Sequence, residues 1–483
     1  MKTNLPLMTD QYKMNSHFAV LPKETERVYS YMEARKGAKY DATLFFGLQY
    51  YIKQYLTTPI TKEDIDYTEA FAQNTNFHEN CFNREGWDYI VNELGGKLPI
   101  RIKAVPEGTI VPTGNVLMTI ENTDEKCAWL TNYIETLLMK LWYPLTVAYR
   151  SNKTMNVIKR AFERSSDLPS SVAQHVFIDF SYRSVTCEEQ AGIGGASHLI
   201  SNFGSDNIAG VRFLMDYYTN GVINDMTKGS ISYGIPASEH SIGTARGEEG
   251  EFEYYENMLD TFPDGLVSIV ADSYNITRFI EEYTPKLKNK ILERYNNGKG
   301  ELNRTIIRPD SLRYEGDTPL KQVVWLHESL GEIFGYEINS KGYKVLHDCI
   351  GIIYADGVSD DEIYEIFNTL NESGWSVDNL AVGQGGGLLN AGDNNTRDTN
   401  RFAIKASAMK QRGKWVDIQK NPLDKTKKSK AGRLILHKDG YDTYHTMKLD
   451  DSQDLKDELV TVYEDGELKV EYNLKDIRAK TMA

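Results

Sequence analysis

The strongest constraint on the fold is an alternation of short apolar runs and helical stretches that begins near residue 175. Alternating strands and helices form a parallel sheet, and six or seven such units favour a closed barrel over an open sheet. We therefore predict an α/β fold with an irregular TIM-like (β/α) barrel, and a doubly wound sheet is the alternative. The apolar runs end in Asp, Arg, His or Gly and are HVFIDFSYR (175–183), SYGIPASEHS (232–241), LVSIVADSY (266–274), RTIIRPDS (304–311), GIIYADG (351–357) and LAVGQGGG (380–387).

The segments on either side of this alternation predict an additional β-rich α+β domain. Residues 1–150 combine helical stretches with short strands, and the stretch 99–122 is broken by Pro-Glu-Gly and Pro-Thr-Gly turns. Residues 151–390 hold the barrel units, and 391–483 hold a basic segment followed by short strands. We expect these C-terminal strands to pack with the N-terminal domain. A helical stretch near the first boundary is predicted to break at Pro144.

Composition excludes several classes of protein. The chain has 483 residues and a net charge of −14, which disfavours a general binder of nucleic acid or anionic membranes. The N-terminus lacks a signal-peptide core, and no apolar run approaches the roughly 20 residues that span a bilayer. The four cysteines are scattered without CxxC spacing, as expected for reduced thiols. We expect a cytoplasmic protein.

A glycine loop and a basic segment predict a phosphate ligand. Gly383 and Gly385 to Gly387 follow an apolar strand, and a loop without Cβ atoms lets backbone N–H groups approach an anion closely. Residues 397–433 contain twelve basic and only three acidic side chains. A flexible turn and a solvated charged face are the simpler explanations. Together, however, the two features suit a polyphosphate.

The predicted strand ends also carry charged side chains. Arg308 and Asp310 follow one strand, where a guanidinium can bind a phosphate and a carboxylate can bind ribose hydroxyls or a metal. A structural ion pair is the alternative. Asp272 and Asp356 occupy equivalent positions, and three such carboxylates fit a sugar phosphate plus Mg²⁺. They fit zinc poorly, because no His is spaced to join them.

One histidine and a group of aromatic residues are further candidates. His240 follows a strand beside Glu239, and Asp272 is available to hold its second ring nitrogen. A lone histidine is more often structural. Phe180 and Arg183, in the segment DFSYR, could stack on and clamp a flat heteroaromatic ring, although the aromatic side chains could equally belong to the core.

The chain resembles the nicotinamide phosphoribosyltransferases from about residue 4 to the C-terminal region. The strands after 435 match more loosely. The resemblance rests on the order of the motifs TDQYK, VYSYMEAR, GLQYYI, AVPEGTIVPTGNVL, WLTNYIETLL, WYPLTVA, DFSYR, AGIGGASHL, GSDNIAG, PASEHS, ADSY, IIRPDS, ADGV and GQGGGLL.

That resemblance implies a reaction and its cofactors. Nicotinamide would attack C1 of 5-phosphoribosyl 1-pyrophosphate, giving nicotinamide mononucleotide and pyrophosphate in NAD salvage. ATP hydrolysis would stimulate the reaction through a phosphorylated His240, which Glu239 and Asp272 would orient. Mg²⁺ would be held through substrate phosphates rather than by a protein cage. The enzyme would be an obligate homodimer with shared active sites.

The resemblance also assigns binding residues. Phe180 and a partner subunit's Tyr12 would sandwich the pyridine ring, with Arg183 nearby. The phosphoribosyl group would be bound by Arg308, Asp310, Asp356, Gly357, Gly385 and Gly386. Pyrophosphate or ATP would be bound by Arg35, Arg397, Lys405, Lys420 and Lys427.

The choice of base depends on Asp206, whose position matches the acceptor for the nicotinamide amide. A carboxylate there would repel nicotinic acid, so we expect nicotinamide to be preferred. Nicotinate phosphoribosyltransferase is the alternative activity, and a non-catalytic phosphosugar-binding protein is the alternative class. The chain departs from the family pattern at Gly234, Leu312, Ala355 and Gln384.

Overall fold

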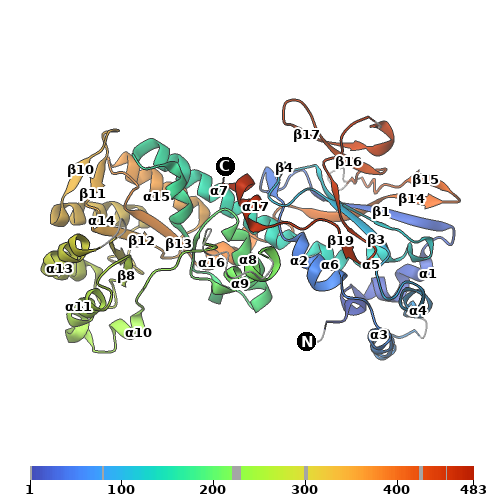
Figure 1. Cartoon of the computed structure of the whole chain (residues 1–483), viewed down its shortest axis with the longest axis horizontal. Coiled ribbons are helices and arrows are strands. Elements are labelled where there is room, and N and C mark those ends of the chain that lie inside the picture. Colours follow the sequence, from blue (N-terminus) through green and yellow to red (C-terminus); the bar gives the residue numbers. More distant parts are fainter. Residues whose placement is uncertain are drawn as a thin grey trace.

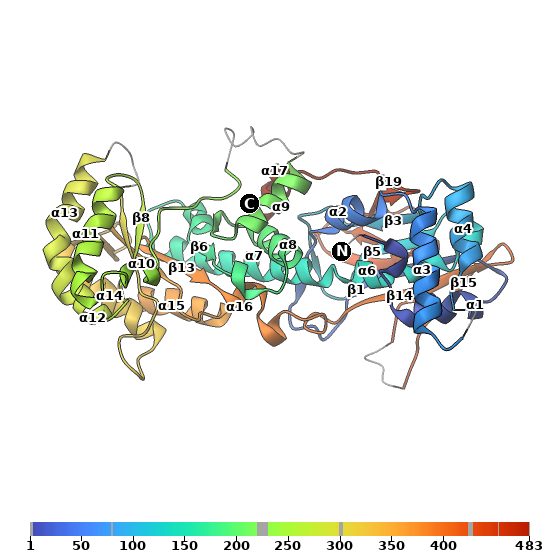
Figure 2. The same ribbon diagram turned by 90° about the horizontal axis from the view of Figure 1, so that it is seen from below.

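The computed structural model describes residues 3–78, 81–219, 230–298, 303–423, 428–452 and 454–482. Figures 1 and 2 show an elongated molecule with a parallel-sheet lobe at one end and an antiparallel-sheet lobe at the other. Helices α7 (Trp142–Ser165), α8 (Glu188–Leu199) and α9 (Ile208–Tyr218) lie between the two lobes.

The parallel-sheet lobe is built on a curled sheet that has six strands within the described residues. The neighbouring strands are parallel, in the order β7-β6-β13-β12-β9-β8. The apolar runs supply these strands because a parallel sheet is covered on both faces. Their bounds are β6 (Phe177–Asp179), β7 (Gly204–Ser205), β8 (Val267–Val270), β9 (Thr305–Arg308), β12 (Ile350–Tyr354) and β13 (Leu380–Gln384).

Within the residues that the structure describes, this lobe does not form the predicted closed TIM barrel. The run SYGIPASEHS was expected to supply a strand between β7 and β8, but it makes only two isolated bridges, Gly204 to Tyr233 and Ala237 to Ser268. Pro236 lies between these bridges and has no N–H group to donate to a ladder. The sheet is therefore a curled half-barrel whose two edges are linked by an extended segment.

Helices cover the outer face of the half-barrel (Figure 1). The helix after β12 begins with a capping box, in which Ser359 and Glu362 each accept from the other's backbone N–H. Gly374 follows that helix with a φ of 85°, as a helix-ending glycine does. The helices are α10 (His240–Gly243), α11 (Glu251–Thr261), α12 (Ile276–Arg278), α13 (Thr284–Asn297), α14 (Pro319–Phe334), α15 (Asp360–Glu372) and α16 (Gly386–Leu389).

The antiparallel-sheet lobe combines both ends of the chain. Its sheet has the order β15-β14-β1-β5-β3-β18-β19, seven strands as far as the described residues show. The long strand β1 pairs with β14 on one side and with β5 on the other. The strands are β1 (Thr25–Ala34), β3 (Ile100–Ala104), β5 (Val116–Asn122), β14 (Phe402–Gln411), β15 (Lys414–Asp417), β18 (Val460–Glu464) and β19 (Glu467–Leu468).

Short hairpins and helices complete both lobes. Two-stranded pairs are formed by β2 (Ala42–Leu44) with β4 (Ile110–Pro112), β10 (Tyr336–Ile338) with β11 (Lys344–Leu346), and β16 (Leu434–Lys438) with β17 (Tyr444–Lys448). The helices of the antiparallel-sheet lobe include α1 (Phe18–Val20), α2 (Leu48–Tyr51), α3 (Lys62–Thr75), α4 (Arg84–Glu93), α5 (Leu130–Tyr133) and α6 (Glu135–Met139).

Two helices join the lobes. Helix α7 runs unbroken through Pro144, contrary to the predicted break, because this proline lies in the first turn, where its missing N–H has no helical partner. Helix α7 also continues through the predicted domain boundary at residue 150. Near the C-terminus, α17 (Leu474–Thr481) inserts Arg478, which donates to the carbonyl oxygens of Leu199, Asn202, Ser230 and Ile231.

One apolar core extends from the parallel-sheet lobe through α7 into the antiparallel-sheet lobe. It includes Ile307 from β9, Leu145 from α7 and Met32 from β1. In the part of the chain that the structure describes, no helix combines the length and the apolar character needed to cross a membrane.

Candidate active site

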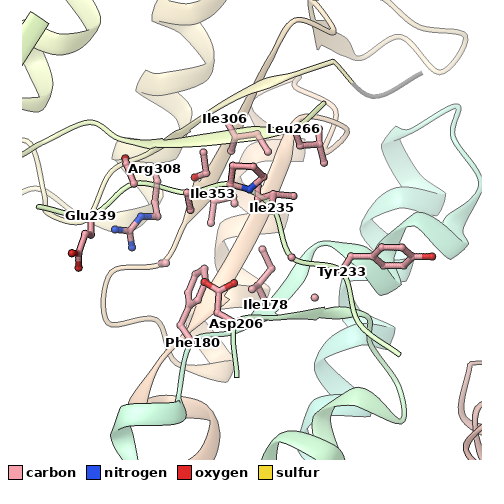
Figure 3. Close-up of a pocket in the computed structure, with 18 of the residues that line it drawn as sticks. Ile178, Phe180, Asp206, Tyr233, Ile235, Glu239, Leu266, Ile306, Arg308 and Ile353 are labelled. Atoms are coloured by element: carbon pink, nitrogen blue, oxygen red, sulfur yellow. The ribbon is translucent and has the colours of Figure 1, made fainter. Parts of the chain in front are cut away.

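A cavity of about 1940 Å³ lies along the inner face of the curled sheet. Apolar side chains, among them Ile178, Ile235, Ile306 and Ile353, line its middle, as Figure 3 shows. Polar residues that follow the carboxyl ends of the strands line one mouth. The sequence-predicted residues in this lining are Phe180, Arg183, Asp206, Glu239, His240, Arg308, Asp310, Gly385 and Gly386.

His240 begins α10 and contacts two other strand-end segments. Its Nε2 lies 3.2 Å from Oδ2 of Asp310, and its Nδ1 lies 3.2 Å from Oγ of Ser273. The expected contact between the ring and Asp272 is replaced by these two partners. The imidazole is half-exposed, is held at both ring nitrogens and lines the cavity. The adjacent Glu239 accepts from the Ser241 hydroxyl at the rim.

Asp272 instead fixes the turn after β9. Its Oδ2 accepts from the backbone N–H of Asp310, at 2.9 Å, and from the hydroxyl of Ser311. This turn places the Asp310 carboxylate between His240 and Arg308, whose Nη1 lies 3.5 Å from Asp310 Oδ1. A histidine, a carboxylate and a guanidinium thus form a continuous row at one edge of the cavity.

Asp356 and Gly357 follow β12 beside this row. Burial raises the pKa of Asp356 above its ordinary value, and the nearby charges of Asp310 and Asp272 raise it further. Gly357 has a φ of 58°, which allows the sharp turn after the strand. Three carboxylates therefore crowd the same strand ends, and this arrangement favours a bound cation or a hydroxylated ligand.

Phe180 and Asp206 lie next to each other at the other side of the cavity (Figure 3). The edge of the Phe180 ring packs directly over Gly383, where an added Cβ would lie 2.2 Å from the ring. Asp206 is exposed and lines the cavity. Its partial enclosure raises the pKa of its carboxyl group, an effect that the nearby Arg308 opposes.

A buried polar group that the sequence did not reveal connects Phe180 to Asp206. Asp179 accepts from the Ser181 backbone N–H, at 2.8 Å, and from the side-chain amide of Asn207, at 3.1 Å. Its own carbonyl oxygen accepts from the backbone N–H of Asp206. One carboxylate therefore sets the spacing of the two loops that carry the aromatic ring and the acid.

The glycine loop is held from behind by a second unpredicted residue. Gly385 and Gly386 line the cavity, and an added Cβ at either would find no neighbour closer than 3.8 Å. Behind them, Arg150 from α7 donates to the carbonyl oxygens of Gly387 and Leu388. Arg150 had no distinguishing pattern in the sequence, because it lies within an ordinary helical stretch.

The described residues predicted to bind pyrophosphate or ATP, which are Arg35, Arg397, Lys405 and Lys420, do not line this cavity. Arg35 directly follows β1 and donates to the Arg401 carbonyl oxygen. Burial lowers the pKa of Lys405, and the positive charges of Arg35, Lys420 and Lys13 lower it further while Glu135 opposes them. These cations therefore form a second cluster near β1 and β14.

Tyr12 and Arg397 are the outer members of this group. Tyr12 has an exposed fraction of 63% and stands beside the buried Lys13. Arg397 is exposed and pairs with Asp398. Lys427 lies outside the described residues. The predicted site residues therefore fall into two groups in opposite lobes of one chain.

Among the described residues, no group of three or more His, Cys, Asp or Glu side chains is placed so that it could hold a metal ion by itself. The strand-end carboxylates nevertheless fit a cation that arrives with a phosphorylated substrate. Oδ1 of Asp272 is buried without a hydrogen-bond partner, and the charges of Asp310, Asp272 and Glu362 all act to raise the pKa of Asp356.

Comparison with known proteins identifies the family. The sequence profile of the nicotinate phosphoribosyltransferase family matches residues 175–467, and that of the nicotinamide phosphoribosyltransferase N-terminal domain matches 4–102. A nicotinamide phosphoribosyltransferase from Xanthomonas campestris is 40% identical, covering 99% of this chain and 97% of the relative. The chain belongs to the family of nicotinamide and nicotinate phosphoribosyltransferases. The resemblance drawn from its motifs is therefore confirmed, and the protein is an enzyme of the pentosyltransferase class.

Further comparisons agree with this family. A nicotinamide phosphoribosyltransferase from Acinetobacter baylyi is 31% identical, covering 98% of this chain and 96% of the relative. The fold is similar to that of nicotinate-nucleotide pyrophosphorylase from Pyrococcus furiosus, with a TM-score of 0.59 at 15% identity, covering 100% of this chain and 96% of the other. Human nicotinic acid phosphoribosyltransferase gives a TM-score of 0.56 at 13% identity, with coverages of 98% and 93%.

Proposed function

We propose that this enzyme transfers the phosphoribosyl group of 5-phosphoribosyl 1-pyrophosphate to nicotinamide, releasing pyrophosphate, in the biosynthesis of NAD. The observation that carries the proposal is the row of His240, Asp310 and Arg308 opposite Phe180 and Asp206, with Gly385 and Gly386 beside it. This mouth offers a stacking surface for a flat base, carboxylates for a cationic sugar and donors for a phosphate.

In this reaction the ribose becomes oxocarbenium-like while negative charge develops on the departing pyrophosphate. Asp310 would hold the ribose hydroxyls, and Arg308 would bind the 5′-phosphate together with the backbone of Gly385 and Gly386. Asp356 and Gly357 would border the sugar. Mg²⁺ bound to the substrate phosphates would offset charge on the leaving group. Asp272 keeps the Asp310 turn in place through its backbone bond.

The base would bind between Phe180 and the aromatic ring of Tyr12 from a second subunit, with Arg183 at the edge. Asp206 would accept from the amide of nicotinamide. The same carboxylate would repel nicotinic acid, so nicotinamide is the proposed substrate. Nicotinate phosphoribosyltransferase activity is the second candidate, and the charge of Asp206 argues against it.

ATP would stimulate the reaction through phosphorylation of His240. Each ring nitrogen already has a partner, Ser273 or Asp310, so phosphorylation must replace one of these hydrogen bonds. The added phosphate would bring negative charge beside Asp310 and could attract Mg²⁺ to the mouth. Glu239 borders the same position.

A homodimer would bring the two groups of site residues together. Tyr12, Arg35, Arg397, Lys405, Lys420 and Lys427 would serve the cavity of the partner subunit, with the last four and Arg35 binding pyrophosphate or ATP. The support is that the described members of this group, Tyr12, Arg35, Arg397, Lys405 and Lys420, do not line the cavity of their own chain. The cysteines Cys81, Cys127, Cys187 and Cys349 are free, which fits a reducing cytoplasm.

The test is an assay of mononucleotide formation with each base, with and without ATP, on wild type and His240→Ala. We expect nicotinamide to be used in preference to nicotinate, and ATP to stimulate wild type only. Equal turnover of both bases would overturn the proposed substrate. Unchanged ATP stimulation in His240→Ala would overturn the phosphohistidine.

A further inference from the structure

Arg150 is an arginine buried behind the cavity wall, with an exposed fraction of 2%. Its Nε and Nη2 atoms each lie 2.9 Å from one carboxylate oxygen of Asp360, in a paired arrangement. Its Nη2 also donates to the Gly387 carbonyl oxygen at 2.7 Å, and its Nη1 to that of Leu388 at 3.0 Å. One planar guanidinium therefore contacts two separate segments of the chain.

These two segments are the loops that follow neighbouring parallel strands. Gly387 and Leu388 belong to α16, directly behind the cavity-lining Gly385 and Gly386. Asp360 is the first residue of α15, directly after the loop that runs from Ala355 to Val358 behind β12. The last carbonyl groups of a single-turn helix have no helical partner, and Arg150 supplies the missing donors.

Gln384 makes a second connection between the same loops. Its side-chain amide donates to the Val358 carbonyl oxygen at 3.0 Å and to Oδ1 of Asp360 at 3.1 Å. Both partners are acceptors, so they fix which end of the amide is the NH₂ group. The Oε1 atom is buried and has no partner, which costs stability. The two hydrogen bonds that Gln384 donates therefore hold its side chain in place although Oε1 has no partner.

The two loops are also in direct van der Waals contact, so neither can move closer to the other. An added Cβ at Gly387 would lie 2.9 Å from the Val358 carbonyl oxygen and 3.0 Å from the Gln384 amide nitrogen. A shift of either loop therefore has to break bonds to Arg150, Gln384 or both. The separation of Ala355 from Gly385 at the cavity wall is set by this group of contacts.

We infer that Arg150 and Gln384 are positioning residues for capture of the phosphoribosyl substrate, fixing the gap between the two loops that would bind its ribose and 5′-phosphate. This inference rests on the proposed function. Neither side chain lines the cavity, so neither touches substrate. Their effect is on the geometry of the backbone groups that do, and it should concern the sugar phosphate more than the base.

The experiment compares Arg150→Met, Arg150→Lys and Gln384→Ala with wild type in steady-state kinetics. Thermal unfolding of each variant confirms that it is folded. We expect the KM for 5-phosphoribosyl 1-pyrophosphate to rise roughly 10- to 100-fold in Arg150→Met and about 10-fold in Gln384→Ala, because small misplacements of binding groups have effects of that size. The KM for nicotinamide should stay within about twofold. The KM of Arg150→Lys for 5-phosphoribosyl 1-pyrophosphate should lie between those of wild type and Arg150→Met, since an ammonium keeps the charge but cannot bridge a carboxylate and two carbonyls.

Calorimetry gives a readout independent of turnover. Ribose 5-phosphate should lose affinity in the same ratio as the KM rises, whereas pyrophosphate, which lacks the 5′-phosphate and ribose, should bind as it does to wild type. A matched control is Arg294→Met, because Arg294 is also buried and donates to three loop carbonyl oxygens, those of Phe262, Asp264 and Gly265, at the amino end of β8. It should lose stability while its KM for the sugar phosphate is unchanged.

The possible outcomes distinguish failure of the proposed function from failure of the positioning role of Arg150 and Gln384. If wild type neither binds ribose 5-phosphate nor forms mononucleotide, the proposed function has failed. If wild type is active and folded Gln384→Ala keeps its KM for the sugar phosphate within about twofold, the positioning role is refuted even if Arg150→Met does not fold. A parallel rise in the KM values of both substrates would also refute it, because it would indicate general loosening of the fold.

Discussion

Phe180 reaches the wall of the cavity because residue 383 has no side chain. The ring edge occupies the space that a Cβ would need, and the methyl group of Ala355 stands 3.0 Å from the same point. The backbone of Gly383 and the methyl group of Ala355 therefore bound the ring on this side. The position of the ring that we propose to stack on the base therefore depends on a glycine in another segment of the chain.

Gly383→Ala should displace the Phe180 ring and weaken binding of the base. We expect the KM for nicotinamide to rise about 10-fold with little change in the KM for the sugar phosphate, because a 2.2 Å contact has to be relieved by moving the ring. Steady-state kinetics with each substrate varied in turn measures the effect. Equal changes in both KM values would contradict this assignment of the ring.

Asp206→Asn should reduce the discrimination between the two bases. An amide can still contact nicotinamide but no longer repels nicotinate, so the ratio of kcat/KM values should fall roughly 10- to 100-fold, the effect of a hydrogen bond to a charged group. Enclosure raises the pKa of Asp206, so this carboxylate is protonated earlier as the pH falls. The wild-type preference for nicotinamide should therefore begin to weaken at a pH above the pKa of an ordinary carboxyl group. A pH series on both proteins checks this, and an unchanged ratio in the variant would exclude Asp206 from base selection.

At the scale of single elements, the N-terminus of α2 holds a buried acid. Oε1 of Glu107 accepts from the Gln49 backbone N–H at 2.8 Å, while its Oε2 is buried without a partner. Burial raises the pKa of Glu107 to about 7, against the opposing effect of the backbone N–H groups. The folded state therefore favours the protonated acid.

Glu107→Gln should stabilise the protein at neutral and alkaline pH. A raised folded-state pKa contributes stability below the unfolded value of 4.5 that is lost as the pH rises to about 7. A rise in pKa from 4.5 to about 7 corresponds to at most about 3 kcal/mol of stability. The midpoint temperature of thermal unfolding should be higher for the variant than for wild type at pH 8, and equal or lower at pH 4. An equal increase in midpoint temperature at both pH values would show that the charge of Glu107 does not cause the stabilisation.

The elements differ in how far the sequence could predict them. Strands β6, β8, β9, β12 and β13 follow from local apolar runs that end in polar residues. The run 232–241 has the same pattern, but Pro236 and the neighbouring Gly234 leave it with single bridges. Pro144 shows the opposite case, because its effect depends on where α7 begins, and flanking residues did not reveal that start.

Side-chain partners were harder to predict than elements. Strand ends correctly suggested that His240, Arg308 and Asp310 would meet, since parallel strands end at one edge. They could not show that Ser273 and Asp310, rather than Asp272, hold the imidazole, because this depends on how each turn bends. The pairing of Arg150 with Asp360 joins residues 210 positions apart, and neither has a local pattern that distinguishes it from an exposed helical residue.

At the scale of the whole molecule, the two groups of site residues lie in opposite lobes. The cavity is lined by Phe180 and by acidic side chains but not by Arg35, Lys405 or Lys420. A two-fold dimer places the same surfaces of each subunit against each other and could pair each cavity with the other subunit's cations. Under the proposed function, the dimer would therefore be required for activity and not only for stability.

Mixing two inactive variants tests that requirement. Asp310→Ala and Lys405→Ala, unfolded and refolded together in equal amounts, should recover about a quarter of wild-type activity, because half the dimers are mixed and each has one intact site. Asp310→Ala mixed with Arg308→Ala is the control, since both residues belong to the same cavity and no intact site can form. Recovery in the control mixture, or none in the first, would contradict shared sites.

The pairing of β1 with β14 has a consequence during synthesis. A ribosome releases β1 at the start of translation and β14 only near the end, so one edge of β1 has no strand beside it in the interval. All the strands of the parallel sheet emerge during that interval. The later part of the chain can therefore fold first, while the earlier part carries an open hydrogen-bonding edge of the kind that invites aggregation. Nascent chains of this enzyme should need a chaperone most just before residue 402 emerges.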